Sequence, residues 1–208
     1  MRIVIPLYDR FTTLDAIGPY EVLRFLPDVD VVFAAARTGP VRNDHGTVGI
    51  VADAALADID TADVLVMPGG PGSRAVCADE DFLGFVRRVH ATTRWTTSVC
   101  SGSLVLAAAG LLTGLKATSH WSVIHILESF GATYIAERVV FQDKIVTAAG
   151  VSAGIDMALH LAGRIVGQTH AEAIQLMIEY DPQPPFHAGS PAKAPQAARD
   201  LITAGHLG

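Results

Sequence analysis

The stretch Thr96-Thr97-Ser98-Val99-Cys100-Ser101-Gly102-Ser103-Leu104 decides the fold, because a β-prone run passes directly into a helical run. The pattern predicts a strand at Trp95–Val99 and a helix at Ser103–Leu112 that ends before Gly114. A sharp strand-to-helix turn of this type presents one side chain at the carboxyl end of a parallel sheet. Cys100 is the residue that the turn would present.

Strands and helices alternate on both sides of this turn. Strands are expected at Arg2–Leu7, Val29–Ala35, Val48–Ala52 and Ala62–Met67, followed later by a β-rich section at Tyr134–Thr147. Helices are expected at Thr13–Phe25, Asp79–Ala91, Trp121–Phe130, from Ser152 to about Gly167, and from a capping box at Thr169 and Glu172 to about Tyr180. Continuous apolar strands between helices predict an α/β sandwich with a mostly parallel sheet covered on both faces.

The composition indicates the class of protein and excludes several functions. The 208 residues fit one domain over residues 1–208, with a Pro-rich C-terminal arm from about residue 182. The chain is 50% hydrophobic and 17% charged, which suggests that a partner subunit covers part of its surface. Its net charge of −6, without a Lys/Arg cluster, argues against binding to nucleic acid or an anionic membrane.

The terminal sequence and the cysteine content point to the cytoplasm. The N-terminal segment has one Arg and a short apolar run without a small-residue cleavage site, so we interpret it as a strand. No apolar stretch reaches the roughly 18 residues that suggest a membrane span. Two cysteines are too few for a disulfide framework and fit a reducing compartment.

Cys100 is the candidate nucleophile. Gly102 would relieve crowding at the turn, and free N–H groups at the following helix start would face the reacting centre. The helix dipole is expected to lower the pKa of the thiol. The alternative is that Cys100 is a small buried hydrophobe, as most free cysteines are. Cys77, beside Ala78 and Asp79 at a helix edge, is interpreted as structural.

Two further segments carry polar candidates. Gly69-Gly70-Pro71-Gly72 follows a buried strand but lacks the pattern of a phosphate-binding loop or a dinucleotide fingerprint. The Gly70 N–H could stabilise negative charge beside the nucleophile, or the segment could be only a tight turn. Asp15 follows the first strand, where it would either cap a helix or, in an apolar pocket, have a raised pKa and relay a proton.

The chain resembles the ThiJ/PfpI superfamily, and within it the isocyanide hydratases, through motifs spread over nearly its whole length. These motifs are Leu14–Pro19 (LDAIGP), Met67–Gly72 (MPGGPG), Thr97–Ser103 (TSVCSGS), Ala117–Trp121 (ATSHW), Gly150–Asp156 (GVSAGID) and Pro184–Pro191 (PPFHAGSP). The resemblance implies a flavodoxin-like three-layer sandwich, a homodimer and no metal or organic cofactor. It also implies hydration of an organic isocyanide to an N-substituted formamide through a thioimidate.

The resemblance assigns roles residue by residue. Cys100 matches the nucleophile, Asp15 its acidic partner, and Ser101 a hydroxyl residue at a position where threonine is common. Gly70 matches the backbone donor beside the thiol. The apolar wall of the substrate pocket is expected at Ile17, Val151 and Phe186.

Other branches of the superfamily fit less well. The protease-like and glyoxalase-like branches often carry His directly after the cysteine, where this chain has Ser101. His120, beside Trp121, is interpreted as a packed, hydrogen-bonded histidine, and its spacing to His125 does not match a helical zinc site, so no metal is expected.

The alternative function is non-catalytic. Parts of the chain also resemble the amino-terminal domains of AraC-type regulators, which would make it a ligand or redox sensor. No basic helical region to read DNA accompanies these segments.

Overall fold

The fold is built on a seven-stranded sheet with strand order β10-β11-β7-β6-β1-β2-β5. A computed structural model describes residues 1–204 of the chain. The strands of this sheet are β1 (Arg2–Pro6), β2 (Asp30–Ala35), β5 (Ala54–Ala55), β6 (Val64–Met67), β7 (Trp95–Val99), β10 (Val139–Gln142) and β11 (Ile145–Ala148). All neighbouring strands are parallel except β10 and β11, which form an antiparallel pair. The predicted mostly parallel sheet is confirmed.

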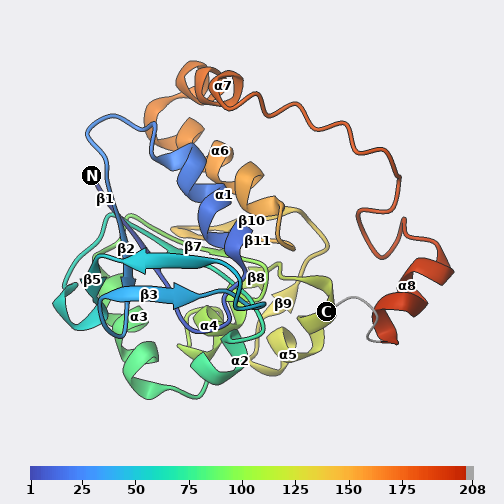
Figure 1. Ribbon diagram of the computed structural model, residues 1–208, viewed down its shortest axis with the longest axis horizontal. Coiled ribbons are helices and arrows are strands. Elements are labelled where there is room, and N and C mark those ends of the chain that lie inside the picture. Colours follow the sequence, from blue (N-terminus) through green and yellow to red (C-terminus); the bar gives the residue numbers. More distant parts are fainter. Residues whose placement is uncertain (205–208) are drawn as a thin grey trace. The chain divides into compact units, whose positions relative to one another are not determined.

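Helices cover both faces of the sheet (Figure 1). Helix α1 (Thr13–Leu23) packs against α6 (Ala153–Val166) on one face, and α7 (Gln168–Met177) packs beside α6. Helices α3 (Glu80–Thr92) and α4 (Gly102–Ala108), with the short α2 (Ser73–Val76), lie on the other face. The arrangement is the predicted flavodoxin-like three-layer sandwich.

Shorter elements lie outside the central sheet. Strands β3 (Gly39–Arg42) and β4 (Gly49–Ala52) form an antiparallel pair, and β8 (Lys116–Ala117) pairs in parallel with β9 (Thr133–Tyr134). The 3₁₀ turns are η1 (Leu56–Asp58) and η2 (Trp121–Val123), and η2 leads into helix α5 (Ile124–Ser129). The single helix expected at 121–130 therefore begins with a 3₁₀ turn, with His120 at its N-cap.

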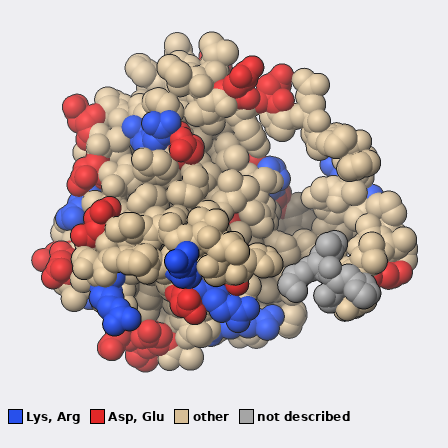
Figure 2. Space-filling model, viewed as in Figure 1, with Lys and Arg blue, Asp and Glu red and all other residues tan. Residues whose placement is uncertain are grey.

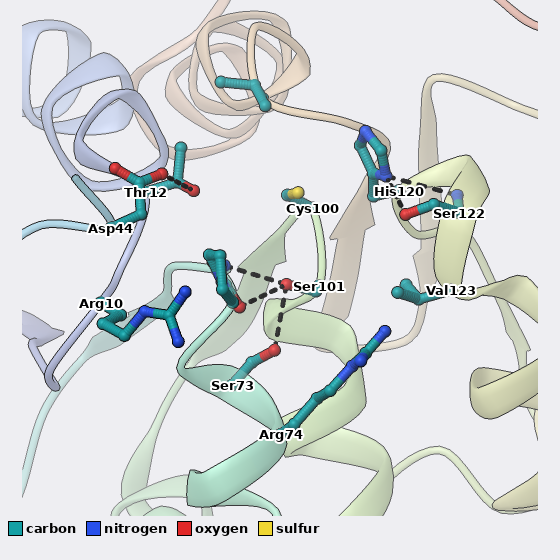
Figure 3. Close-up of a pocket in the computed structure, with 13 residues that line it drawn as sticks. Arg10, Thr12, Asp44, Ser73, Arg74, Cys100, Ser101, His120, Ser122 and Val123 are labelled. Atoms are coloured by element: carbon teal, nitrogen blue, oxygen red, sulfur yellow. Dashed lines mark hydrogen bonds between the residues drawn. The ribbon is translucent and has the colours of Figure 1, made fainter. Parts of the chain in front are cut away.

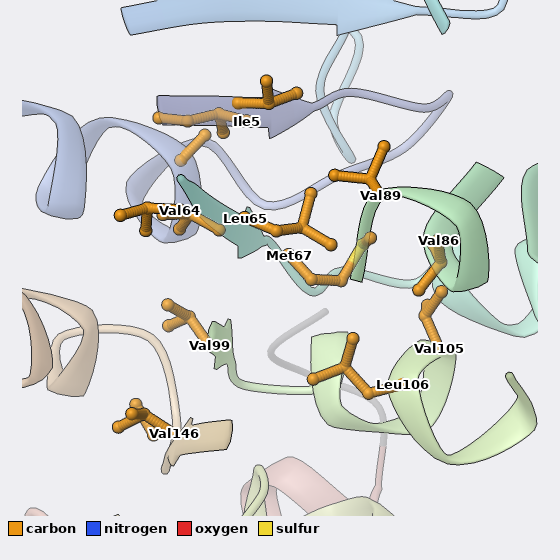
Figure 4. Close-up of a cluster of buried hydrophobic side chains, with 14 of the residues drawn as sticks. Ile5, Val64, Leu65, Met67, Val86, Val89, Val99, Val105, Leu106 and Val146 are labelled. Carbon is orange, nitrogen blue, oxygen red and sulfur yellow. The ribbon is translucent and has the colours of Figure 1, made fainter. Parts of the chain in front are cut away.

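The side chains of the central strands belong to one hydrophobic core (Figure 4). Strand β6 reads Val-Leu-Val-Met, and all four of its residues are fully buried. Both faces of a parallel strand in such a sandwich are covered by helices, so its sequence is apolar without alternation. Val86 and Val89 of α3 and Val105 of α4 pack on the same core. This packing holds the carboxyl ends of β6 and β7 in place, where the candidate residues lie.

Helix α7 does not begin at the predicted capping box. It begins at Gln168, and Gly167, at φ 91°, occupies the N-cap position. Thr169 therefore lies inside the helix, and Glu172 accepts a hydrogen bond from Gln168 Nε2 at 2.7 Å. Glycine adopts this positive φ without strain, so α7 begins two residues earlier than the capping box predicted.

The chain divides into two compact units, Met1–Ile178 and Glu179–Gly208. The second unit contains the Pro-rich segment expected from about residue 182 and a helix, α8 (Gln196–Thr203). Phe186, expected in the pocket wall, belongs to this second unit and is 79% exposed. Whether the whole chain acts as a single domain stays a prediction.

The surface of the described residues carries mixed charges. On the face drawn in Figure 2, basic and acidic side chains are interspersed. Within residues 1–204, no helix combines the length and the apolar character needed to cross a membrane.

Candidate active site

Cys100 occupies the predicted sharp turn between β7 and α4. Its φ of 57° lies in the left-handed region, which is unusual for a residue other than glycine. Four hydrogen bonds hold this conformation. The Cys100 N–H donates to the carbonyls of Ala148 and Ala149, each at 3.1 Å, and its carbonyl accepts from Ser103 Oγ at 3.2 Å and Ser119 Oγ at 3.0 Å. Such a strained conformation, supported from several sides, is typical of a functional turn.

Gly102 permits the turn to pass close to the end of β6. A Cβ atom at this position would lie 2.2 Å from the Met67 carbonyl oxygen and 2.9 Å from the Pro68 carbonyl carbon. Both neighbours are backbone atoms, so they cannot rotate away as a side chain could. The prediction that Gly102 relieves crowding is confirmed.

Asp15 is fully buried in the first turn of α1, but it does not cap that helix. Its Oδ2 accepts a hydrogen bond from the Gly69 N–H at 2.9 Å, and its Oδ1 is buried without a hydrogen-bond partner. Burial raises the pKa of this carboxyl from 3.8 to about 7, although the bond from Gly69 and hydrogen bonding with the Cys100 thiol act in the opposite direction. The structure therefore favours the predicted raised pKa over the capping role.

The Cys100 thiol does not have the lowered pKa that the sequence predicted. Burial, and secondarily the negative charge of Asp15, raise its pKa to about 12, while the backbone N–H groups of Val151 and Ser101 lower it. The prediction was wrong because the thiol is only 6% exposed and the following helix, α4, has only seven residues. The loss of solvation outweighs the stabilisation from the N–H groups.

Cys100 and Asp15 therefore titrate as a coupled pair. Each affects the pKa of the other through charge and hydrogen bonding. Between about pH 7 and pH 12 the pair carries one proton, which the thiol and the carboxyl compete for. The arrangement can deliver a sulfur nucleophile and a proton from adjacent groups.

Ser101 joins the cysteine turn to the glycine loop. Its Oγ accepts hydrogen bonds from the Gly70 N–H at 2.9 Å and from Ser73 Oγ at 3.1 Å, and donates to the Gly70 carbonyl at 3.2 Å. The Gly70 N–H, expected to face the thiol, is thus directed to Ser101 instead. The donors beside the sulfur are the N–H groups of Ser101 and Val151. The sequence did not indicate the backbone of Val151 as a donor, because it comes from a distant segment.

A cavity of about 540 Å³ opens over Cys100 (Figure 3). Its lining consists of Arg10, Thr12, Asp44, Gly70, Pro71, Ser73, Arg74, Cys100, Ser101, His120, Ser122, Val123 and Val151. Of the predicted site residues, Cys100, Ser101, Gly70 and Val151 are in this lining. Asp15 and Ile17 are not: Asp15 is buried beneath it, and Ile17 is half-buried on α1.

His120 both packs and lines the cavity. Its ring lies 5.4 Å from that of Trp121, and its Nδ1 accepts a hydrogen bond from the Ser122 N–H at 3.3 Å. The interpretation as a packed, hydrogen-bonded histidine is confirmed, but its place in the cavity was missed. Burial lowers the pKa of the ring below its usual value, so His120 is neutral at pH 7.

Three charged lining residues, Arg10, Asp44 and Arg74, were also missed. No motif surrounds them, and they come from separate loops and a short helix. Their only sequence signal is proximity to the recognised segments, with Arg10 before Asp15 and Arg74 after the glycine loop. Within residues 1–204, no three His, Cys, Asp or Glu side chains are arranged to hold a metal ion.

The fold agrees with the comparisons to known proteins. Residues 1–164 match the model of the DJ-1/PfpI family, and the chain belongs to that family. It is 43% identical over 194 residues to an isonitrile hydratase of Pseudomonas putida, covering 93% of this chain and 85% of the relative. The crystal structure of a ThiJ/PfpI family protein from Pseudomonas syringae has a TM-score of 0.94 at 40% identity, covering 98% of this chain and 84% of that one.

Part of this chain also matches a transcriptional regulator. The HTH-type transcriptional regulator GbdR of Pseudomonas aeruginosa is 31% identical over 134 residues, covering 64% of this chain and 36% of the regulator. The predicted resemblance to the ThiJ/PfpI superfamily is confirmed.

Proposed function

We propose that this chain is a hydro-lyase that adds water to organic isocyanides and releases N-substituted formamides. The observation that carries the proposal is that Cys100, on a strained turn, lines a cavity and is paired with the buried carboxyl of Asp15. The identity of 43% to an isonitrile hydratase over most of both chains supports the same reaction.

The first step forms a covalent bond to sulfur. The Cys100 sulfur attacks the terminal carbon of R–N≡C, and a carbon–sulfur bond forms. The thiol proton passes through the Asp15 carboxylate to that same carbon, which gives the thioimidate R–N=CH–S–Cys. The unpartnered Asp15 Oδ1 is the oxygen available for this transfer. The N–H groups of Ser101 and Val151 stabilise negative charge on the sulfur before the attack, and again when the carbon–sulfur bond breaks.

The second step uses water. A water molecule adds to the thioimidate carbon while the nitrogen takes a proton, with Asp15 as the acid–base group. The carbon–sulfur bond then breaks, the sulfur regains its proton, and R–NH–CHO leaves. One water is added and no oxidation state changes overall, so the reaction needs no redox partner.

The remaining predicted residues position these groups. Ser101 holds the glycine loop through both polar atoms of Gly70, so we assign Gly70 to positioning Ser101. Val151 contributes lining as well as its N–H group. Ile17 is proposed to contact the apolar part of the substrate from α1.

Turnover of simple isocyanides tests the proposal. Purified protein is incubated with cyclohexyl isocyanide, phenyl isocyanide and, as a comparison substrate, methylglyoxal, and the products are measured by NMR. We expect N-cyclohexylformamide and N-phenylformamide, each lost in Cys100→Ala. Turnover of methylglyoxal without formamide from either isocyanide would contradict the proposal.

A second candidate function is a non-catalytic ligand or redox sensor. The match to GbdR favours it, because that regulator contains a related segment. A sensor would bind isocyanides or undergo oxidation at Cys100 without releasing formamide. The same product measurement therefore separates the two functions.

We also propose that the protein acts as a cytoplasmic homodimer without nucleic-acid or membrane partners. Leu176 and Met177, at the end of α7, are 79% and 69% exposed and supply apolar surface for a second copy. The Pro182–Pro191 segment is the proposed contact arm. Sedimentation showing only monomer at micromolar concentration would contradict the homodimer.

A further inference from the structure

Two arginines without ion-pair partners line the cavity over Cys100. Among residues 1–204, neither Arg10 nor Arg74 has a carboxylate within 4.0 Å or a side-chain hydrogen bond. We propose that the substrates of this protein are isocyanides that carry an anionic group, such as a carboxylate, which Arg10 and Arg74 bind. The inference rests on the proposed function and specifies its substrate class.

The backbone of Arg10 is held in a conformation that few residues adopt. Its φ is 62°, in the left-handed region. The Arg10 N–H donates to the Arg42 carbonyl at 3.1 Å, and its own carbonyl accepts from the Gly72 N–H at 3.2 Å. These bonds fix the backbone of Arg10 between β3 and the glycine loop, so the fold sets the direction in which the side chain leaves the backbone. A non-glycine residue in this conformation is a candidate for function.

Arg74 is tied to the nucleophile turn through its neighbour. Ser73 begins α2 and donates its hydroxyl to Ser101 Oγ at 3.1 Å. In Figure 3 the Arg10 side chain extends toward the Ser101 network, and the Arg74 side chain extends toward Val123. Both guanidinium groups therefore border the space in front of Cys100. A guanidinium binds a carboxylate with two parallel hydrogen bonds, which also orients the ligand.

The other ionisable groups at the cavity do not cancel this charge. Asp44 is the one carboxylate in the lining, and both of its oxygens accept hydrogen bonds from neutral donors. The Thr12 hydroxyl donates to Oδ2 at 3.0 Å, and the His45 N–H donates to Oδ1 at 3.0 Å. His120 is neutral at pH 7, and Asp15 lies beneath the lining. Within the lining itself, two positive charges face one negative charge, so this surface of the cavity attracts anions. This local excess contrasts with the net charge of −6 for the whole chain.

Paired substrates test the proposal. Isocyanoacetate and 4-isocyanobenzoate are each compared with their methyl esters, and kcat/KM is measured for all four. For the wild-type protein we expect at least one acid to be preferred over its ester by about 10- to 100-fold, the effect of one charge-assisted contact. In the double variant Arg10→Gln/Arg74→Gln the preference should fall to about 1, mainly through a higher KM for the acid. Arg87→Gln, which removes an exposed arginine paired with Glu80 on α3, is the matched control and should keep the preference.

The outcomes separate the substrate class from the reaction itself. Hydration of the esters as fast as the acids, or a preference that survives in the double variant, would overturn the role of the arginines and leave the hydratase function standing. Absence of formamide from all four compounds would overturn the proposed function, and the substrate class with it. Thermal unfolding of the double variant confirms that it is folded, as expected for two exposed side chains.

Discussion

Cys100 and Cys77 are both free thiols whose pKa is raised by burial, yet the fold places them in different surroundings. Cys77 directly follows α2 and is half-buried, and burial alone raises its pKa to about 11. Cys100, with a pKa of about 12, also has a neighbouring carboxyl, two backbone N–H groups and an open cavity. The comparison shows that the pKa of an isolated thiol does not distinguish the two. The available proton acceptor and the space for a substrate do.

The largest expected difference comes from removing each thiol in turn. Cys100→Ala should lower isocyanide hydration by about four orders of magnitude or more, because the covalent route is lost. Cys77→Ala should stay within about twofold of the wild type, since an isolated surface-proximal thiol has no part in the reaction. Formamide release measured on both variants checks this. Equal losses in the two variants would contradict the assignment of Cys100.

Removing the carboxyl partner tests what distinguishes Cys100. Asp15→Asn keeps the shape of the side chain but cannot relay a proton, so turnover should fall by roughly two to four orders of magnitude. Asp79→Asn is a matched control, because Asp79 caps α3 by accepting from the N–H groups of Asp81 and Phe82, and Asn caps equally well. The control should retain turnover. A near-normal rate in folded Asp15→Asn would remove Asp15 from the mechanism.

The pH dependence of the rate should follow the coupled pair. Below the Asp15 pKa of about 7 the pair holds two protons, and above it one proton is lost. We therefore expect kcat/KM to rise with pH through about 7 and then level off. In Asp15→Asn the rise should move above pH 9.0, the ordinary pKa of a thiol, because the thiol must then lose its own proton and burial still raises its pKa. A profile with the same midpoint in both proteins would show that another group controls the rate.

The stability of the protein should respond to the same titration. The folded-state pKa of Asp15 is raised from 3.8 to about 7. The protonated carboxyl therefore makes its full contribution to the free energy of unfolding below about pH 4, and this contribution is lost as the pH rises through 7. This rise in pKa corresponds to a loss of about 4 kcal/mol in the free energy of unfolding once the carboxyl is ionised. Asp15→Asn lacks this penalty, so its free energy of unfolding should gain on the wild type by about 3 kcal/mol between pH 5 and pH 8, the part of the total that falls in this pH range. Denaturant titrations at the two pH values measure the gain, and a constant difference would contradict the buried carboxylate.

Local patterns predicted the central features of the fold and the position of the nucleophile. Strand β7 was predicted with its observed bounds, and the turn at Cys100 and the need for glycine at 102 were correct. The strand and the position of the turn depend on residues adjacent in the chain, where strand propensity acts directly. The contact that requires glycine at 102 comes from Met67 and Pro68, at the end of β6. The errors at the site concern the thiol pKa and the direction of the Gly70 N–H, and both depend on what other segments bring to the same place.

The sequence by itself determined that strands alternate with helices, that Cys100 stands at a strand-to-helix turn, and that the chain resembles one family. Only the tertiary structure decided the state of that cysteine and the character of its cavity. Burial and Asp15 raise the pKa of the thiol, and Arg10 and Arg74 enter the cavity from separate segments. The physical reason is that solvation and charge depend on distance through space, whereas turn geometry depends on neighbours along the chain.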